Sequence, residues 1–199
     1  MPPKVDHRRA IAERNAAGIL DAVERLLQRG ASLNMAAIAT EAGVSRPTLY
    51  AHYKTIADVV EAAVERVVVR STAAFRAARP EDGPADAALE RMFEASLGQL
   101  ARFEGLARVA GEYLSAGALH RSHHALMAPL HALIARGRRD GSFRTDLPAE
   151  WLQTMYIQLV HGADEHAATY GLPRDEALEL LKTSARDLFA PRGLSLIHI

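Results

Sequence analysis

The chain contains no cysteine, which excludes a disulfide framework, thiol redox sensing and a thiolate metal site. It also lacks any uninterrupted apolar run of the roughly 18 residues that a membrane-spanning helix requires. Its first ten residues lack the apolar stretch of a signal peptide. We therefore expect a cytoplasmic protein with no membrane partner.

Net charge is also absent, since 24 lysines and arginines balance 24 aspartates and glutamates. This balance hides an asymmetry along the chain. Residues 1–54 carry eight basic against five acidic side chains, and residues 55–199 carry sixteen against nineteen. The first quarter is therefore basic, which keeps nucleic acid among the possible partners. Arg8, Arg9 and Arg14 begin this region, either to reach DNA phosphate or a minor groove, or as a solvated helix start.

Strand-like alternation bounded by turn residues is missing, whereas apolar residues recur at helical spacing through most of the chain. With 49% hydrophobic and 24% charged residues, the chain can bury a core. We predict an all-α fold of about nine helices. The expected helical segments cover 6–79 with interruptions at 30–33 and 43–45, two helices broken near Gly105, and segments at 119–140, 150–170 and 174–189.

Residues 34–54 have the pattern of two short helices joined by a glycine turn. The first has Asn34 at its N-cap position and one apolar face, formed by Met35, Ile38, Ala39 and Ala42. Gly43 supplies a left-handed turn, and Val44 fills the corner between the helices. Ser45 caps the second helix, whose first turn accepts Pro47 because the amide that proline lacks would be unpaired there.

In the second helix, Leu49 and Tyr53 lie four residues apart and are expected to face inward. The exposed side chains are then Pro47, Ala51 and Lys54 at the centre, Tyr50 on one flank, and Thr48 and His52 on the other. Such an arrangement in a basic region is typical of a recognition helix that enters the major groove of DNA.

Residues 8–60 resemble the DNA-binding domain of the TetR (tetracycline-repressor-like) family of bacterial transcriptional regulators. The apolar face of the first helix matches that family, as does the glycine that ends it: Ile19, Leu20, Ala22, Val23, Leu26, Leu27 and Gly30. The motif residues follow in the family's register without a gap: Ile38, Ala39, Ala42, Gly43, Val44, Ser45, Thr48, Leu49, Tyr50, His52 and Tyr53. Beyond residue 60 the resemblance is one of length and helical architecture. The resemblance implies a transcriptional repressor.

Two polar and two apolar side chains are candidates for base contacts. We expect Arg46 to bridge the O6 and N7 atoms of guanine and His52 to donate to one base acceptor. The apolar side chains of Pro47 and Ala51 suit thymine methyl groups. Together with the residues that cap the helix or contact the DNA backbone, the expected DNA-binding set is Ser45, Arg46, Pro47, Thr48, Tyr50, Ala51, His52 and Lys54.

The backbone contacts follow from the resemblance, which implies that hydroxyls at Thr48 and Tyr50 bind the DNA backbone. Packing is the alternative role for Tyr50. The chain departs from the family at Ile56, where a lysine usually meets a phosphate at the start of the fourth helix, and Lys54 is the candidate replacement. Pro47 replaces a frequent glycine, so we expect an unusual operator sequence.

The expected domains are a helix-turn-helix DNA-binding domain at 1–54 and a helical effector-binding and dimerisation domain at 55–190. The second begins with a connecting helix at 55–79, and residues 191–199 form a tail. The apolar uncharged SLIHI at the C-terminus is either a packed tail or an artefact at the end of the coding region. A loop is expected at 80–84, where two prolines and a glycine interrupt the helical pattern.

Because one such module binds weakly, we expect a homodimer on a palindromic double-stranded DNA operator. Apolar arcs on the last two helices form the predicted dimer interface, unless they only bury the core of the monomer. Its residues are Trp151, Leu152, Met155, Tyr156, Leu159, Val160, Ala163, Leu178, Leu181, Ala185 and Leu188.

The middle helices are expected to enclose a pocket for a small apolar effector that releases the protein from DNA. Candidate walls, with histidines as polar anchors, are Leu97, Phe103, Tyr113, Met127, Leu130, His131, Ile134, Met155 and His161. Ordinary core packing is the alternative role for these residues. An activator or architectural DNA-binding protein without an effector is the alternative function.

Nine histidines include a group near one turn, His120, His123 and His124, and a pair at helical spacing, His161 and Glu165. No set has a recognised zinc spacing, so we expect no metal and no cofactor. A second group of arginines flanks the loop near residue 140 and is expected to be solvated: Arg136, Arg138, Arg139 and Arg144. Nucleophile motifs and phosphate-binding glycine loops are absent, so we expect no enzyme, and an enzyme or a protein-interaction module is only a remote alternative.

Overall fold

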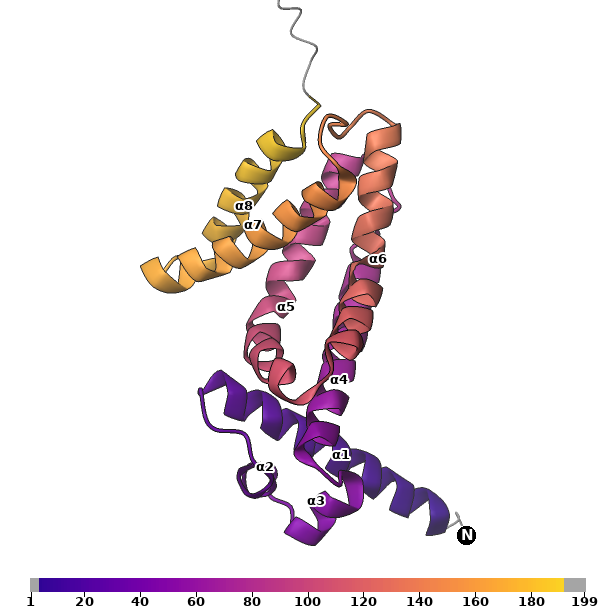
Figure 1. Cartoon of the computed structure of the whole chain (residues 1–199), viewed down its shortest axis with the longest axis vertical. Helices are drawn as coiled ribbons and strands as arrows, with labels where there is room; N and C mark the ends of the chain where they lie inside the picture. The colour runs from indigo at the N-terminus through magenta and orange to yellow at the C-terminus, as the bar shows by residue number, and fades with distance from the viewer. Residues whose placement is uncertain (1–3, 192–199) are drawn as a thin grey trace, which may run out of the picture. The chain divides into compact units, whose positions relative to one another are not determined.

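The computed structural model describes residues 4–191, apart from the side chains of residues 4–6, 100–104, 107, 119–123 and 125. Residues 4–191 form α-helices and no β-strand, so the all-α prediction is confirmed (Figure 1). The helices are α1 (Lys4–Gln28), α2 (Met35–Ala42), α3 (Arg46–His52), α4 (Ile56–Ala77), α5 (Ala85–Tyr113), α6 (Ala116–Arg139), α7 (Ala149–Tyr170) and α8 (Arg174–Phe189). The terminal SLIHI lies outside the described residues.

Helix α5 differs from the expected pair of helices, because its backbone stays helical through Gly105. A β-carbon added at Gly105 would lie 3.1 Å from the β-carbon of Leu27 in α1, which is closer than ordinary packing allows. The prediction of a break was wrong because a helix tolerates one glycine at a cost of about 1 kcal/mol relative to alanine. Here the small residue permits a close approach to α1.

The helices form two compact units. The N-terminal unit comprises Met1–Val68 and Arg102–Ser122, and the C-terminal unit comprises Val69–Ala101 and His123–Ile199. Helices α4, α5 and α6 therefore contribute residues to both units. The predicted functional boundary at residue 54 stays a prediction, because compactness does not define which segments bind DNA or effector.

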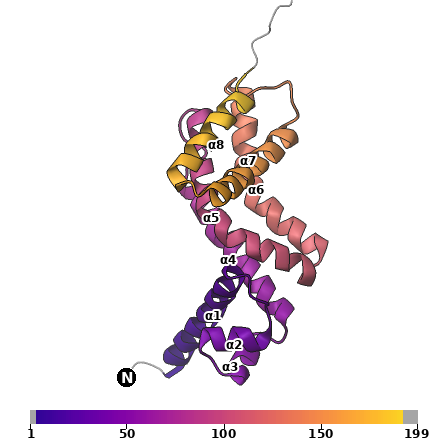
Figure 2. The same ribbon diagram turned by 90° about the vertical axis from the view of Figure 1, so that its left-hand side faces the viewer.

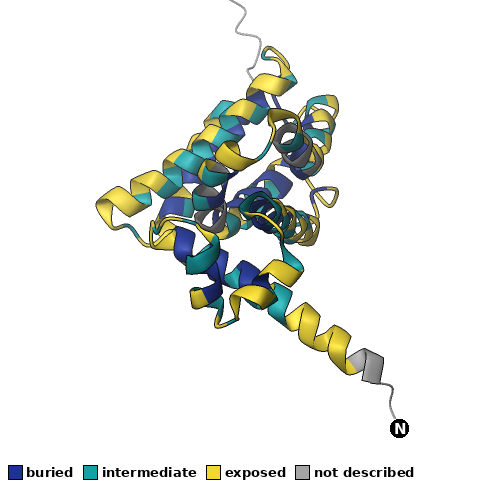
Figure 3. Ribbon diagram, turned by 60° about the horizontal axis from the view of Figure 1, so that its bottom comes forward, coloured by how far each residue is buried: buried dark blue, intermediate teal, exposed yellow. Residues whose placement is uncertain are grey.

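The N-terminal unit is built around a core that α1 shares with α2, α3, α4 and the end of α5. Figure 3 shows buried positions along the inner part of α1 and an exposed stretch at its start. Burying each large apolar side chain stabilises such a core by about 1.5–3 kcal/mol. The fully enclosed members include Ile19, Val23, Ile38, Leu49, Val59, Val60 and Leu106.

In the C-terminal unit, α7 and α8 lie side by side in both ribbon views (Figure 1, Figure 2). On the inner side of α7, the ring of Tyr156 stacks on Phe93 of α5, with centroids 4.4 Å apart. The Tyr156 hydroxyl and Ser96 Oγ are 2.6 Å apart, so a hydrogen bond satisfies both buried groups. Burial raises the pKa of Tyr156 above its ordinary range, so the phenol stays neutral.

The second arginine group is mostly not a solvated edge, which corrects the expectation from the sequence. Arg136 donates to the carbonyl oxygens of Gly83 and Pro80 at 2.7 and 2.8 Å. Arg138 donates to the Leu147 carbonyl at 2.5 Å. Arg144 is buried and donates to Asp146 through two nitrogens, Nε to Oδ1 at 2.7 Å and Nη2 to Oδ2 at 2.6 Å. These arginines stabilise the loops at 80–84 and 140–148 by binding their carbonyl and carboxylate oxygens.

A stability prediction follows from Gly137 in α6. A β-carbon there would lie 2.2 Å from Cδ2 of Phe143, which is buried and packs edge to face on Phe189. The Gly137→Ala variant must displace that ring, and we expect unfolding free energy to fall by about 3 kcal/mol. Gly111→Ala is the matched control, because nothing lies within 4 Å of its added β-carbon.

For Gly111→Ala we expect a gain of about 0.5–1 kcal/mol from helix propensity and reduced freedom of the unfolded chain. Urea unfolding followed by circular dichroism distinguishes the two variants. Equal urea midpoints for Gly137→Ala and Gly111→Ala would show that the Phe143 ring can move away from residue 137 without a loss of stability.

Candidate DNA-binding surface

The turn between α2 and α3 is determined by short-range interactions that the sequence predicts. Asn34 Oδ1 accepts a hydrogen bond from the Ala37 amide at 2.9 Å and caps α2. Gly43 ends α2 in the left-handed region, with φ +66° and ψ +28°, which only glycine adopts without strain. The Val44 amide then donates to the Ala39 carbonyl at 3.0 Å. The chain reverses here as a helix-turn-helix requires.

Helix α3 is anchored on its inner side and open on its outer side. Ser45 caps it, since its Oγ accepts from the Thr48 amide at 3.2 Å and also lies 2.7 Å from Thr48 Oγ1. Leu49 is fully buried in the core of the N-terminal unit, and Tyr53 is half-buried beside it. Removing a serine N-cap costs about 1 kcal/mol, so this hydrogen bond matters to so short a helix.

The predicted DNA-binding residues lie together on this helix and just after it. Their side chains are exposed except for two of intermediate exposure, Thr48 and His52. The exposed ones are Ser45, Arg46, Pro47, Tyr50, Ala51 and Lys54. Tyr50 is 46% exposed, which leaves its hydroxyl accessible. One face thus presents a guanidinium, an ammonium, a phenol and two small apolar groups.

The start of α4 explains the departure at Ile56. The Ile56 side chain packs against the core of the N-terminal unit, so it helps hold α4 in place. Asp58 Oδ2 accepts from the amides of Lys54 and Thr55, both at 2.9 Å, and Thr55 Oγ1 accepts from the Asp58 amide. These hydrogen bonds, first the amide of Thr55, lower the pKa of Asp58. The reciprocal hydrogen bonds of Thr55 and Asp58 form a capping box. This capping box fixes the backbone of Lys54, whose side chain stays exposed.

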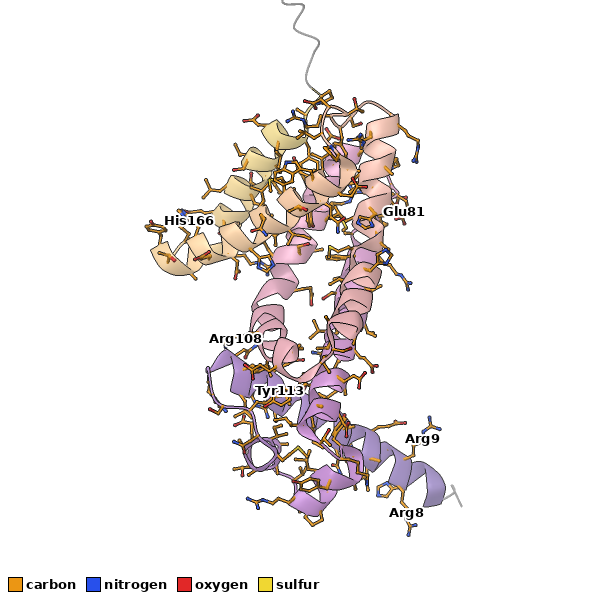
Figure 4. All side chains as sticks on the ribbon, viewed as in Figure 1. Arg8, Arg9, Glu81, Arg108, Tyr113 and His166 are labelled. Carbon is orange, nitrogen blue, oxygen red and sulfur yellow. The ribbon has the colours of Figure 1, made fainter. Side chains whose placement is uncertain are left out.

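The arginines at the start of the chain lie on a helix. Arg8 and Arg9 occupy the free end of α1, with exposed side chains (Figure 4). Arg9 Nε is 2.9 Å from Glu13 Oε1, an exposed pair of the kind worth only a few tenths of a kcal/mol. These cations and Arg14 are consequently accessible to a phosphate.

Two groups of ion pairs hold the neighbouring helices, and the sequence did not reveal them. Glu41 at the end of α2 accepts from Arg25 Nε at 2.7 Å and Arg29 Nη2 at 2.5 Å. These hydrogen bonds, first that of Arg25, lower the pKa of Glu41, so it is ionised at neutral pH. In α4, Arg66 donates to Asp21 at 2.8 Å and to Glu24 at 2.5 Å in α1. Sequence patterns rarely show such pairs, because the partners lie 12 to 45 residues apart.

The predicted dimer residues fall into different environments. Several are buried within the protomer: Leu152, Tyr156, Val160, Leu181 and Ala185. Leu178 is partly exposed, and Trp151 is 49% exposed. An open apolar groove between α7 and α8 has among its walls Met155, Leu159, Ala163, Leu181 and Leu188. The groove adds residues outside the predicted set, among them Leu180 at 52% exposure, which lies off the apolar stripe used for prediction.

The predicted effector residues are also divided. Leu97, Met127, Leu130 and Ile134 are buried in the C-terminal unit. The partly exposed His131 shares a hydrogen bond with Gln153 of α7, and its ring meets that of His124 edge to face. Met155 lines the α7–α8 groove, and His161 is partly exposed on α7. Tyr113 belongs to the N-terminal unit, and the Phe103 side chain lies outside the described ones.

Among the side chains that the structure describes, no three histidine, aspartate or glutamate residues gather as a metal site would require. His120 and His123 lie outside those side chains. Across the described residues, no helix combines the length and apolarity needed to cross a bilayer.

Comparison with known proteins agrees with this geometry. Residues 19–63 match the model of the bacterial regulatory proteins of the tetR family. The HTH-type transcriptional repressor LfrR from Mycolicibacterium smegmatis is 29% identical over 176 residues, covering 86% of this chain and 88% of LfrR. The crystal structure of LfrR in complex with proflavine matches with a TM-score of 0.67 and 26% identity, over 87% of this chain and 94% of that chain.

A TetR family regulator from Marinobacter aquaeolei VT8 shares the fold, with a TM-score of 0.76 at 19% identity over 92% of this chain and all of that chain. These relatives are regulators and not enzymes. The family match covers the last part of α1, all of α2 and α3, and the start of α4, so it includes the exposed face of α3. Residues 19–63 therefore carry the helix-turn-helix region of the tetR family of bacterial regulatory proteins, and the chain as a whole is similar to transcriptional regulators of that family.

Proposed function

We propose that the protein is a homodimeric repressor that binds a palindromic operator through α3 and leaves it when a small apolar effector binds. The exposed face of α3 is the observation that carries this proposal. Its caps and buried Leu49 hold the helix by its inner side, so Arg46, Tyr50 and Lys54 remain available to DNA. We assign Arg46 and His52 to base edges and Thr48, Tyr50 and Lys54 to the DNA backbone.

The dimer proposal rests on the groove between α7 and α8. Its walls are mainly apolar, with Met155, Leu159, Leu180 and Leu188 among them. An apolar surface of this kind favours burial against another protein surface. A second copy of the same pair of helices would form a four-helix bundle and place two recognition helices on one DNA duplex.

The effector proposal places the ligand in the C-terminal unit. Buried Leu97, Met127, Leu130 and Ile134 supply apolar walls, and His131 with Gln153 supplies polar anchors. LfrR has been solved with proflavine, which supports a small-molecule ligand for this chain as well. Effector binding is expected to favour a separation of the two recognition helices that no longer matches the operator.

Selection of bound sequences from random duplex DNA tests the proposal. We expect a palindrome whose half-sites lie about 34–36 Å apart or a multiple of that distance. Titration of the selected site at several salt concentrations then separates specific from electrostatic binding. Addition of small apolar compounds should release the labelled operator. Failure to enrich any sequence would refute operator binding, and an operator released by no compound would favour a regulator without an effector.

A further inference from the structure

Two ion clusters meet on α1, and we define them together as the ionic brace: Asp21, Glu24, Arg25, Arg29, Glu41 and Arg66. The first links α4 to α1, since Arg66 donates to Asp21, to Glu24 and, at 3.2 Å, to the Ala17 carbonyl. The Arg66 side chain is only 15% exposed. Its planar guanidinium therefore spans two turns of α1 and opposes sliding of α4 along it.

The second cluster links α2 to α1. Each carboxylate oxygen of Glu41 accepts from a different arginine, and Arg25 Nη2 also donates to the Glu41 carbonyl at 3.2 Å. The last turn of α2 is thus held at its side chain and at its backbone. Glu24 and Arg25 are neighbours on α1, so the two clusters connect α4, α1 and α2 in one series.

The orientation of helix α3 depends on its neighbours α2 and α4. It has seven residues, and Leu49 is its one fully buried side chain. Apolar burial is not directional, so one leucine does not fix the direction in which α3 points. That direction depends on α2 through the rigid turn at Gly43 and on α4 through the short connection after His52. Charged hydrogen bonds with fixed geometry are suited to setting both.

We propose that Glu41 and Arg66 are positioning residues for operator recognition. The ionic brace sets the orientation of α2 and α4 on α1, and this in turn sets the orientation of α3. The proposal rests on the proposed reading of an operator by α3. The two arginine partners of Glu41 are 48% and 58% exposed, so solvent screening keeps the contribution of such pairs to global stability small. Loss of the brace should therefore reduce discrimination between DNA sequences more than it reduces stability.

The test compares Glu41→Gln with Glu61→Gln in the full-length protein. Both remove one negative charge from the N-terminal unit, and Glu61 is an exposed residue of α4 outside the brace. Both variants should bind nonspecific DNA slightly more tightly because a repelling charge is gone. Only Glu41→Gln should also lose operator affinity, by about tenfold, because a changed orientation of α3 weakens its contacts to the bases. Arg66→Lys keeps the positive charge but lacks the planar guanidinium that donates to two carboxylates at once. It should lose operator affinity as Glu41→Gln does.

The ratio of operator to nonspecific affinity is the decisive quantity, measured well below each unfolding midpoint. An equal ratio in Glu41→Gln, Arg66→Lys and Glu61→Gln would overturn the brace. Hydrogen exchange of the amides in residues 35–52 provides a test without operator DNA. Exchange through local opening of α2 and α3 should be roughly threefold faster in Glu41→Gln than in Glu61→Gln. If no operator exists, the proposed function fails, while unchanged exchange would overturn the brace separately.

Discussion

Replacing Arg46 and Tyr50 together by alanine is expected to lower operator affinity at least 100-fold. A bidentate arginine contact to guanine contributes about 1–3 kcal/mol to discrimination, and a hydrogen bond to a charged phosphate about 1.5–3 kcal/mol. Both losses occur in each half-site of a dimer. The two side chains are exposed, so the fold should be preserved. Fluorescence anisotropy with the selected operator measures the loss.

The single variants should separate reading of bases from binding of phosphates. Arg46→Ala should relax the sequence preference at one position of each half-site. Lys54→Ala should weaken binding to all sequences alike and reduce the salt slope by about one per half-site. Arg139→Ala is the control, because it removes one exposed positive charge from the C-terminal unit. An operator affinity in the Arg46 and Tyr50 double variant that matches this control would exclude α3 as the recognition helix.

Leu180→Glu is expected to convert the proposed dimer into monomers at micromolar concentration. Leu180 is half-exposed in the groove between α7 and α8, so its replacement leaves the core of the protomer intact. Leu180 is already about half-buried in the protomer, so burying the rest contributes about 0.8–1.5 kcal/mol, and the two-fold axis doubles this to roughly 1.5–3 kcal/mol per dimer. The dissociation constant should therefore rise at least roughly 10-fold to 100-fold. Desolvating two carboxylates adds to the effect.

Val69→Glu is the matched control for that experiment. Val69 is also an exposed apolar residue of the C-terminal unit, and it lies outside the groove lining. Sedimentation velocity should show a dimer for Val69→Glu and a monomer for Leu180→Glu, with operator affinity lost only in the latter. Dimers of equal stability in both variants would place the interface on another surface and contradict the four-helix bundle.

The sequence predicted the helix-turn-helix accurately because its determinants are local. Asn34, Gly43 and Ser45 act on atoms within five residues of themselves along the chain, so their residue types and spacing are sufficient. Burial of Leu49 and exposure of Arg46 follow from the period of an α-helix once those caps are known. Helix α8 has the predicted bounds for a similar reason, since Pro173 precedes its first turn and Pro191 follows its end.

Tertiary packing decided the features that join distant segments. Periodicity shows that α7 and α8 have apolar sides, yet only the packed structure separates buried Tyr156 from groove-lining Leu159 and Leu180. Composition likewise cannot distinguish a solvated arginine from the buried Arg144, whose carbonyl partner on Leu188 lies 44 residues away and becomes a neighbour only after folding. By itself the sequence determined the resemblance to the family, most of the helices and the exposed face of α3, because these depend on neighbouring residues. The ionic brace, the groove and the loop-binding arginines depend on which helices meet, and only the tertiary structure decides that.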